Sequence, residues 1–425
     1  MLKIIYNRFR TIVSHYYSYH IKLNWILFKQ KRFLSQIRNK EEISVVFFAM
    51  NLAMWRYQSL YEAMIKNPIF KVYIVLSPCI SFSKEQQYKD IEKIREYFSK
   101  QSIPYIDYDF NKQNIFDVKK ILNPDLVFYP QPYPFLLSKE HDSRNFQDKL
   151  LCYYPYAFWT AYSPWSYNEY FHNIAWKLYY STDFHKKDAI HFAYNKGKNV
   201  VVVGYPNADN FIFKLSKNVW KSQLKPKKRI IWAPHFTISK ERSFVVHSSF
   251  LWMADFMIEI AQKYAGEIQI AFKPHPRLLT ELYAHPDWGK EKADAYYRIW
   301  SEMPNGQLED GEFKDLFMTS DGMIHDSSSF TVEYHYSLKP VMYIQENLKA
   351  YADTLSEFGK FALDAHYSGK SKQDIIDFVE NNILKGIDPM YSKRKQFYDR
   401  FLLPPNNKSV AENTLDDILK SLKKK

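Results

Sequence analysis

Two short stretches of the chain combine side chains that bind phosphate with side chains that can transfer a proton. The first, residues 272–276 (Phe-Lys-Pro-His-Pro), alternates a lysine and a histidine with prolines. The second, residues 324–330 (Ile-His-Asp-Ser-Ser-Ser-Phe), follows about fifty residues later and carries a histidine, an aspartate and three serines. An ammonium group, an imidazole and a row of hydroxyls are together suited to holding a diphosphate.

The first stretch ends an apolar run, residues 268–272, which predicts a buried strand. Prolines lack a backbone N–H and fix the direction of the chain, so the strand should stop there. Lys273 and His275 are therefore expected at the carboxyl end of that strand. In open α/β sheets ligands bind at this edge, because the loops there converge with the amino termini of helices.

The second stretch has the same expected placement with different chemistry. Residues 322–324 predict a strand and residues 331–338 the helix that follows it. The hydroxyls of residues 327–329 should then lie at or just before the helix start, where they and the backbone N–H groups can face an anion. Glu333 falls about one turn further along the same face and could accept hydrogen bonds from a ribose diol. Taken singly, a serine cluster before a helix is also an ordinary helix cap, and a Lys-Pro-His-Pro turn is an ordinary turn.

Five motifs in the right order make the second half of the chain resemble the CDP-glycerol glycerophosphotransferases, the family of teichoic-acid primases, polymerases and their capsule-making relatives. In the order of the family's pattern, they are a Gly-Tyr-Pro-x-x-Asp junction at 204–209, an Ala-Pro strand end at 233–235 with His235 in place of threonine, a Lys-x-His-Pro turn at 273–276, an Asp-x-Ser-Ser turn at 326–329 followed four residues later by Glu333, and a Lys-Pro-Val strand start at 339–341.

The resemblance implies a reaction in which an acceptor hydroxyl attacks the polyol-bearing phosphate of a CDP-linked donor and CMP leaves. Phosphoryl transfer asks a protein mainly to position the reactants and to neutralise charge. On this interpretation the catalytic candidates are His275, Lys273 and His235, with His275 also able to protonate the departing CMP phosphate. The donor-binding candidates are His325, Asp326, Ser327, Ser328, Ser329 and Glu333.

Some of these residues have a structural interpretation as well. Asp326 is expected to brace its turn rather than to touch substrate. His235 and His325 each follow a predicted strand and face the expected cleft, but either is also compatible with a structural histidine. The set requires no metal and no cofactor. The polyol, glycerol or ribitol, is not encoded by any motif.

One departure from the family pattern concerns the acceptor. Members carry a Trp-His-Gly-x-Pro motif in the amino-terminal domain, whose histidine is the expected base for the acceptor hydroxyl, and residues 151–159, where it would align, contain no histidine. The weak replacements are Tyr154, Tyr156 and His172, and for each of them packing or hydrogen bonding in the core is the favoured interpretation; the alternative is a reaction that is differently arranged in this subgroup. The missing histidine keeps open an inactive membrane-associated scaffold of the same fold. A nucleotide-sugar glycosyltransferase is disfavoured by the Asp-x-Ser-Ser turn and by the lack of a Glu-x7-Glu pattern.

Strands alternate with helices along the chain, which predicts parallel sheets. We expect an α/β protein with two Rossmann-like domains facing a cleft, the GT-B type that the resemblance also implies. The expected domains are 41–206 on the acceptor side and 207–385 on the CDP-donor side, with helices of 386–425 crossing the junction. The predicted strands are 43–50, 71–77, 126–129, 150–154, 200–203, 229–232, 268–272, 322–324 and 341–344, and the main predicted helices are 55–66, 84–99, 250–264, 313–319, 331–338, 372–384 and 409–422.

Composition fits a two-domain enzyme. The chain has 425 residues, 46% of them hydrophobic, which is enough for two cores. Only two cysteines occur, so a disulfide scaffold is excluded and a reducing compartment is expected. No Cys/His cluster has the spacing of a zinc site. With 10 glycines and no Gly-rich phosphate loop, anion binding must rely on hydroxyls and cationic side chains.

Residues 1–40 carry nine basic residues, no acidic residue and several aromatics. No apolar run there is long enough to span a bilayer. Basic and aromatic residues together are typical of a segment that lies on anionic headgroups, which predicts a peripheral protein at the cytoplasmic face of the cell membrane, with a lipid-linked or polysaccharide acceptor. A solvated arm or a first helix packed on its domain is the alternative. The net charge of +13 also suits nucleic acid, but no nucleic-acid-binding motif accompanies it, so none is expected as a partner.

Overall fold

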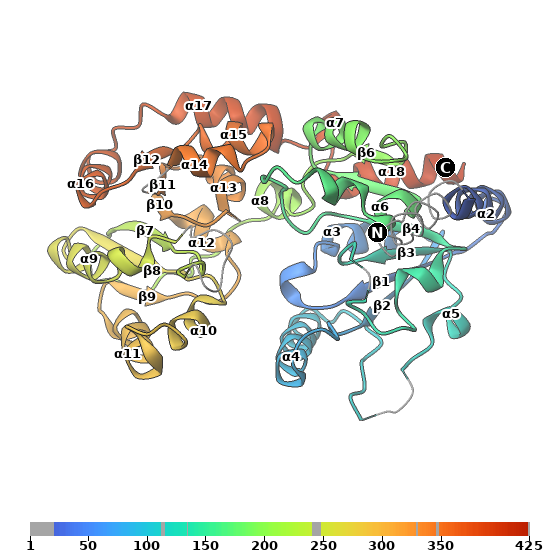
Figure 1. Ribbon diagram of the computed structural model, residues 1–425, viewed down its shortest axis with the longest axis horizontal. Helices are drawn as coiled ribbons and strands as arrows, with labels where there is room; N and C mark the ends of the chain where they lie inside the picture. Colours follow the sequence, from blue (N-terminus) through green and yellow to red (C-terminus); the bar gives the residue numbers. More distant parts are fainter. Residues whose placement is uncertain are drawn as a thin grey trace, which may run out of the picture. The chain divides into compact units, whose positions relative to one another are not determined.

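Two six-stranded sheets carry the fold, and their named strands all pair in parallel (Figure 1). The strand orders are β2-β1-β3-β4-β5-β6 and β12-β11-β10-β7-β8-β9. The computed structural model describes residues 21–111, 115–133, 135–239, 248–328, 330–345 and 348–423. The prediction of an α/β protein with two Rossmann-like domains is confirmed.

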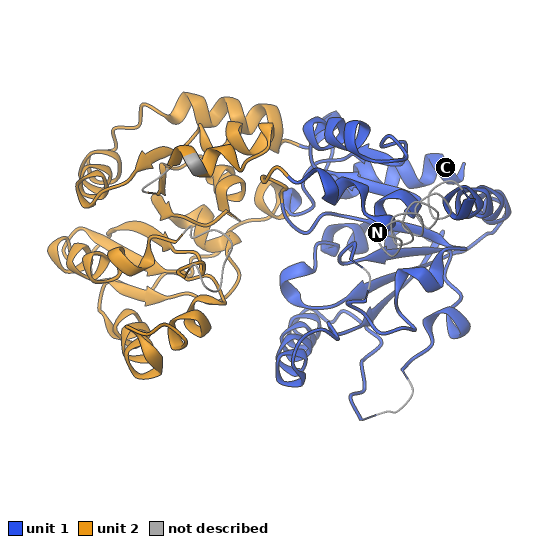
Figure 2. Ribbon diagram, in the orientation of Figure 1, with its two compact units in different colours: residues 1–157, 163–209, 404–425 blue, residues 158–162, 210–403 orange. Residues whose placement is uncertain are grey.

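The chain divides into two compact units (Figure 2). Unit 1 comprises residues 1–157, 163–209 and 404–425, and unit 2 comprises 158–162 and 210–403. The chain changes unit between residues 209 and 210 and again between 403 and 404. The excursion of 158–162 into unit 2 was not predicted. Those residues belong there through backbone bonds, since Tyr162 N–H donates to the Thr354 carbonyl and Ser356 N–H donates to the Thr160 carbonyl.

Unit 1 is built from the first six strands and the helices around them. Its strands are β1 (Ile43–Ala49), β2 (Phe70–Leu76), β3 (Leu126–Tyr129), β4 (Leu150–Tyr153), β5 (Lys177–Tyr180) and β6 (Val200–Val202). Its helices are α2 (Leu23–Ile37), η2 (Leu52–Met54), α3 (Gln58–Ile65), α4 (Lys84–Lys100), α5 (Val118–Ile121), η3 (Ser143–Phe146), η4 (Pro164–Asn168), α6 (Tyr170–Ile174), α7 (Asp183–Phe192), η8 (Pro405–Asn407) and α18 (Val410–Leu422), and α8 (Ala208–Phe213) runs on into unit 2.

Unit 2 repeats this architecture. Its strands are β7 (Lys228–Ala233), β8 (Ile268–Phe272), β9 (Gly306–Leu308), β10 (Gly322–His325), β11 (Val341–Ile344) and β12 (Tyr367–Gly369). Its helices are α9 (Phe250–Lys263), α10 (Leu278–Tyr283), α11 (Gly289–Glu302), α12 (Lys314–Thr319), α13 (Phe330–Glu333), η5 (Tyr334–Ser337), α14 (Leu348–Asp353), α15 (Glu357–Leu363), α16 (Lys372–Asp377), η6 (Phe378–Leu384), α17 (Tyr391–Phe397) and η7 (Tyr398–Leu402).

The structure adds three strands that the sequence did not predict and divides two predicted helices. β9 and β12 have three residues each, too few to show a period, and β5 lies in an aromatic-rich stretch without clear alternation. The predicted helix 331–338 is α13 followed by the 3₁₀ turn η5, and it ends where Leu338 takes a left-handed φ of 57°. The predicted helix 372–384 changes at residue 378 from α16 into the π-helix η6.

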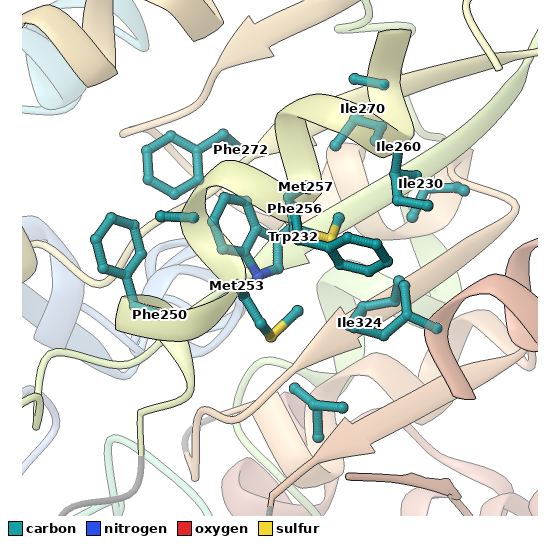
Figure 3. Close-up of a cluster of buried hydrophobic side chains, with 14 of the residues drawn as sticks. Ile230, Trp232, Phe250, Met253, Phe256, Met257, Ile260, Ile270, Phe272 and Ile324 are labelled. Atoms are coloured by element: carbon teal, nitrogen blue, oxygen red, sulfur yellow. The ribbon is translucent and has the colours of Figure 1, made fainter. Parts of the chain in front are cut away.

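An aromatic core fixes the strands of unit 2 that end at the candidate site. Trp232 of β7 packs on Phe272 of β8 and on Phe250 of α9, with ring centroids 4.9 and 5.8 Å apart. Figure 3 shows these rings together with Met253 and Met257 of α9. Burying a side chain of this size contributes about 2 kcal/mol. Because Trp232 is three residues before His235 and Phe272 directly precedes Lys273, their packing holds the ends of both strands.

The junction motif at 204–209 has a structural role in unit 1. Gly204 has a φ of 101°, and a Cβ there would lie 3.0 Å from Val410, so only glycine fits. The buried Asp209 carboxylate accepts hydrogen bonds from the N–H groups of Val410 and Ala411 at 2.7 and 3.0 Å. The motif thereby fastens the start of α18 to the unit.

The predicted membrane segment is described only from residue 21 on, and 1–20 lie outside the described residues. The described part does not stand apart from the domain, because the helix α2 packs on unit 1 through Leu23, Ile26 and Ile37. Trp25 and Phe28 on its other face are each 56% exposed. Among the described residues, no helix is both long and apolar enough to cross a membrane.

Candidate functional site

The carboxyl ends of three adjacent strands of unit 2 bring the two motif stretches together. In the sheet β10 pairs with β7, and β7 pairs with β8, so that His325 lies opposite Ala233 and Trp232 opposite Phe272. Neighbouring strands are about 4.8 Å apart. Residues separated by about ninety positions in the sequence thus begin their loops side by side at one edge.

The carboxylate of Asp326 links the loops at this edge through hydrogen bonds. Its Oδ1 accepts the N–H of His235 at 2.5 Å, and its Oδ2 accepts the N–H and the hydroxyl of Ser249 at 2.5 and 2.6 Å. Burial raises the pKa of the carboxyl to about 6, against the lowering effect of these hydrogen bonds. Both oxygens are used within the protein, so Asp326 ties together the ends of β7 and β10 and the start of α9.

His275 presents a neutral hydrogen-bond donor at the same edge. Its backbone N–H donates to the Pro234 carbonyl at 3.0 Å, which fixes the turn after β8 against the turn after β7. Its Nδ1 accepts the N–H of Arg277 at 3.1 Å, so the ring hydrogen is on Nε2. Burial, with a smaller contribution from the Arg277 charge, lowers the pKa of His275 to about 4. At neutral pH the ring therefore donates one hydrogen bond without carrying a charge.

His235 lies beside His275, with ring centroids 5.1 Å apart. Its Nδ1 contacts the Thr237 hydroxyl at 2.9 Å, and its side chain is largely buried. Phe236 packs at a tilt against both imidazoles, with ring centroids 4.4 and 4.5 Å away, and carries the Arg277 guanidinium over its face at 4.1 Å. The two imidazoles thus share the same aromatic and cationic neighbours, Phe236 and Arg277.

Lys273 is held by an acidic loop. Its Nζ donates to the Gly311 carbonyl at 2.7 Å, and the side chain is buried. Burial lowers the pKa of the amine, while the carboxylates of Glu309, Glu312 and Asp310 act in the opposite direction. In this structure its charge is therefore directed at residues 309–312, and its predicted contact with a diphosphate stays a prediction.

The serine turn is supported by backbone rather than by a long helix. The Ser327 carbonyl accepts His325 Nδ1–H at 3.0 Å and the Thr331 hydroxyl at 3.3 Å, and the Ser328 side chain is half-buried. Ser329 lies outside the described residues. α13 has four residues, so its dipole is weaker than that of the predicted helix 331–338. Glu333, at the end of α13, is buried.

Behind the turn lies His366, a residue that the sequence analysis did not single out. The Nε2 atoms of His325 and His366 are 3.1 Å apart, and His366 Nδ1 faces the Ala362 carbonyl at 2.9 Å. The two neutral rings hold two N–H protons for three hydrogen bonds, and a third proton would charge the pair. Burial lowers the pKa of His325 and of His366, the latter to about 3, so neutral rings are favoured.

Comparison with known proteins identifies the family to which this chain belongs. The sequence profile of the family described as CDP-Glycerol:Poly(glycerophosphate) glycerophosphotransferase matches residues 167–420, more than half of the chain. The chain belongs to this family. It is therefore a CDP-glycerol glycerophosphotransferase-family enzyme, as the motifs predicted. A search of curated proteins finds no match.

Solved structures of low sequence identity share the two-domain GT-B-like fold. A variant of the wall teichoic acid polymerase TagF is similar over 98% of each chain, with a TM-score of 0.57 at 14% identity. The UDP-GlcNAc 2-epimerase of Neisseria meningitidis, bound to UDP-GlcNAc, covers 89% of this chain and 99% of its own, with a TM-score of 0.55 at 14% identity. S. aureus MnaA with UDP covers 90% and 97%, with a TM-score of 0.53 at 15% identity.

The acceptor-side candidates of the transferase lie in unit 1 and are mostly buried. The Tyr154 hydroxyl donates to Thr414 Oγ1 at 2.5 Å within the core, and His172 packs near the rings of Tyr153 and Phe171. Burial lowers the pKa of His172 to about 3 and raises that of Tyr156. Tyr156 is half-buried and follows the carboxyl end of β4, so it is the best placed of the three to meet a ligand.

The part of the chain that the structure describes contains no group of three or more His, Cys, Asp or Glu that could hold a metal ion. Ser249 was missed by the sequence analysis, although serines at 248–249 directly before a predicted helix are a capping pattern that could have drawn attention to it. Its hydroxyl serves Asp326 instead of the helix. No comparable signal marks His366, which precedes a three-residue strand.

Proposed function

We propose that this transferase moves a polyol phosphate, glycerol phosphate or ribitol phosphate, from a CDP-linked donor to a hydroxyl of a lipid-linked or polysaccharide acceptor, in the synthesis of a teichoic-acid-like or capsular polymer. The acceptor oxygen forms a bond to the polyol-bearing phosphorus, the bond from that phosphorus to the CMP oxygen breaks, and CMP leaves. The observation that supports this most is the convergence of His235, His275 and the 325–328 turn at one edge of unit 2, inside the region that matches the family.

His275 is the central residue of the proposed donor site. Its Nε2–H is the group available to a diphosphate oxygen, because Nδ1 already accepts from Arg277. A bound diphosphate would raise the low pKa of His275, since a nearby negative charge favours the imidazolium. On donor binding His275 would thus take up a proton from solvent, and this proton would stabilise, and could pass to, the departing CMP phosphate.

The remaining roles follow from position. Ser327 and Ser328, with their backbone amides, would hold the same phosphates, and Glu333 would bind the ribose. Lys273 would add positive charge beside this edge. We assign the acceptor proton to His235, because it is the titratable group next to His275 and the family's amino-terminal histidine has no counterpart in residues 151–159.

We also propose that the protein is peripheral at the cytoplasmic face of the membrane, on anionic lipids. Trp25 and Phe28 stack at 5.8 Å on the exposed face of α2, and Lys29 lies 5.2 Å from the Trp25 ring. Aromatic and basic side chains in this arrangement suit a headgroup interface, where each basic residue contributes roughly 1 kcal/mol. Replacing Trp25 and Phe28 with serine should release the protein from anionic vesicles in a sedimentation assay, and unchanged binding would contradict the placement.

The activity is tested by CMP release from CDP-glycerol and, separately, from CDP-ribitol, with a detergent-solubilised lipid or oligosaccharide acceptor. Release with one donor that disappears in His275→Ala would support polyol-phosphate transfer and identify the polyol. An absence of release from both donors by the folded wild-type protein, with every acceptor class, would contradict the proposal.

A further inference from the structure

A recessed surface of unit 2 lies at the opposite edge of its sheet from His275. It is a cavity of about 580 Å³ between the segment 218–227 and the turn 318–321. Its lining includes Arg229 and Gln269 near the starts of β7 and β8, and Lys339 shortly before β11. These are amino-terminal ends of parallel strands. Strands of five or six residues at about 3.3 Å per residue put this surface about 17–20 Å from the catalytic edge.

The surface is strongly basic. Five basic side chains line it, and the acidic residue in the lining is Asp321. Residues 214–229, which supply most of the lining, contain seven basic residues and no acidic one. Asp321 already accepts the Arg229 N–H at 2.9 Å and the Lys228 Nζ at 3.3 Å, so its charge is engaged.

Three of the lining lysines are available to a ligand. Lys221 donates to the Met303 carbonyl at 2.9 Å, and the Arg229 guanidinium lies over the Trp220 ring. The side chains of Lys225, Lys227 and Lys339, by contrast, have no hydrogen bond or ion pair with any residue that the structure describes. Cations that converge on a hollow without partners favour an anionic occupant.

The lining distinguishes between classes of anion. Trp220 is buried and its indole N–H donates to Thr319, so it offers no exposed ring on which a nucleobase could stack. The polar amides and hydroxyls of Asn218, Ser222 and Gln223 suit a ligand with hydroxyls and repeated phosphates. A recessed surface also suits a flexible chain better than a flat bilayer, although the exposed Leu215 and Leu224 of the same segment would suit lipid.

We propose that this basic pocket binds the phosphodiester backbone of the growing polyol-phosphate acceptor. The inference rests on the proposed function, and specifically on an acceptor that already carries polyol-phosphate units and is therefore polyanionic. A chain held here while its end reaches the catalytic edge must cover the length of the strands, so long acceptors gain a second attachment and short ones do not. The pocket thereby makes affinity depend on acceptor length through effective concentration.

The test compares two triple variants of the full chain. Lys225→Gln, Lys227→Gln and Lys339→Gln together remove the three available cations. Lys349→Gln, Lys360→Gln and Lys370→Gln remove the same charge from exposed positions of unit 2 outside the pocket. Binding of fluorescent glycerol-phosphate oligomers, long and short, is measured by anisotropy across a salt series, and CMP release is measured with a short acceptor.

The variant with all three pocket lysines replaced should bind the long oligomer about tenfold more weakly. The negative slope of log affinity against log salt should become shallower by about two, since each lost phosphate contact removes about 0.7. The control triple and the rate with the short acceptor should change little. An equal loss in both triples, or no loss in the pocket triple, would overturn the proposal. So would a loss of binding to anionic vesicles with oligomer binding intact, which would make the surface a lipid contact.

Failure of the proposed function gives a different result. If wild-type protein releases no CMP from either CDP-polyol but binds the long oligomer through the pocket lysines, the reaction is wrong and the pocket stands. If CMP is released but the pocket lysines do not affect the oligomer, the reaction stands and the pocket proposal fails.

Discussion

The carboxyl edges of the two sheets share the same parallel-strand architecture but differ in the types of side chain that follow the strands. In unit 2 the strands β7, β8 and β10 lead into His235, Lys273 and Asp326, and titratable side chains meet there. In unit 1 the strands β3 and β4 lead through Tyr129 and Tyr153 into prolines and further aromatics. A parallel sheet therefore provides a place for a ligand, and the loop residues decide whether that place does phosphate chemistry.

The difference extends to the buried carboxylate of each unit. Asp209 of unit 1 and Asp326 of unit 2 both accept backbone N–H groups in the core. Asp209 secures a helix remote in sequence, α18, whereas Asp326 joins two loops of the candidate site. Similar hydrogen bonds to a buried carboxylate thus contribute to stability in unit 1 and to the geometry of the candidate site in unit 2.

The largest effect on activity should come from removing the imidazole of His275. His275→Ala deletes the Nε2–H that we place on the diphosphate, and loss of one such donor costs about a hundredfold to a thousandfold in rate. The mutant should keep its circular dichroism spectrum and melting temperature, because the ring is at the edge of the unit. Steady-state CMP release measures the loss. A rate within threefold of wild type would remove His275 from the mechanism.

Asparagine substitutions of the two buried carboxylates, Asp326 and Asp209, sharpen the comparison. Asp326→Asn replaces an oxygen with an amide that must face an N–H of His235 or Ser249, leaving buried donors unpaired, which should cost about 3 kcal/mol of unfolding free energy. Asp209→Asn should cost about 2 kcal/mol for the same reason. Urea titration measures both. Donor KM should rise in the folded fraction of Asp326→Asn and stay unchanged in Asp209→Asn, and the reverse pattern would contradict the assignment of the site to unit 2.

Acidification tests unit 1 through His172. Its folded pKa of about 3 is below the unfolded value of about 6.5, so the unfolded state binds more protons between these pH values and stability falls as the pH drops through this window. From pH 7.5 to 5 the loss from this residue should be about 2 kcal/mol. His172→Leu should remove that part of the pH dependence of urea unfolding. Since buried histidines of unit 2 act in the same direction, the measured quantity is the difference between wild type and variant.

The smallest effect concerns His366. Replacing it with glutamine puts a side-chain amide N–H near His325 Nε2 but at a changed position, so the 325–328 turn should loosen slightly. We expect donor KM to rise about threefold with kcat nearly unchanged, and His366→Ala to raise it further. An effect on kcat with no change in KM would mean that His366 acts in chemistry rather than in positioning.

The sequence predicted the strand ends well because apolar runs there stop at residues with clear physical consequences. The prolines at 274 and 276 end β8, and the polar stretch after residue 324 ends β10 within one residue of the prediction. The predicted strands of unit 1 also match within one residue. Local chemistry decided these boundaries, so a single sequence was sufficient.

The contacts of the site depended on tertiary structure and were less predictable. Nothing near Lys273 indicates that its amine reaches Gly311, 38 residues away, or that His366 meets His325, 41 residues away. The helix after the serines was predicted too long, because its change to a 3₁₀ turn before Leu338 is not visible in the apolar pattern. Residue types predicted the chemistry, and the fold determined which partners each residue found.

The most direct test of the assignment of donor binding to unit 2 is calorimetric titration of CDP into wild-type protein, His275→Ala and Tyr133→Phe, the last a control at an exposed tyrosine that follows β3 of unit 1. We predict that wild type and Tyr133→Phe bind CDP with the same affinity and that His275→Ala binds at least tenfold more weakly. Equal binding by wild type and His275→Ala, with affinity lost in Tyr133→Phe, would contradict the assignment and place the donor at the aromatic edge of unit 1.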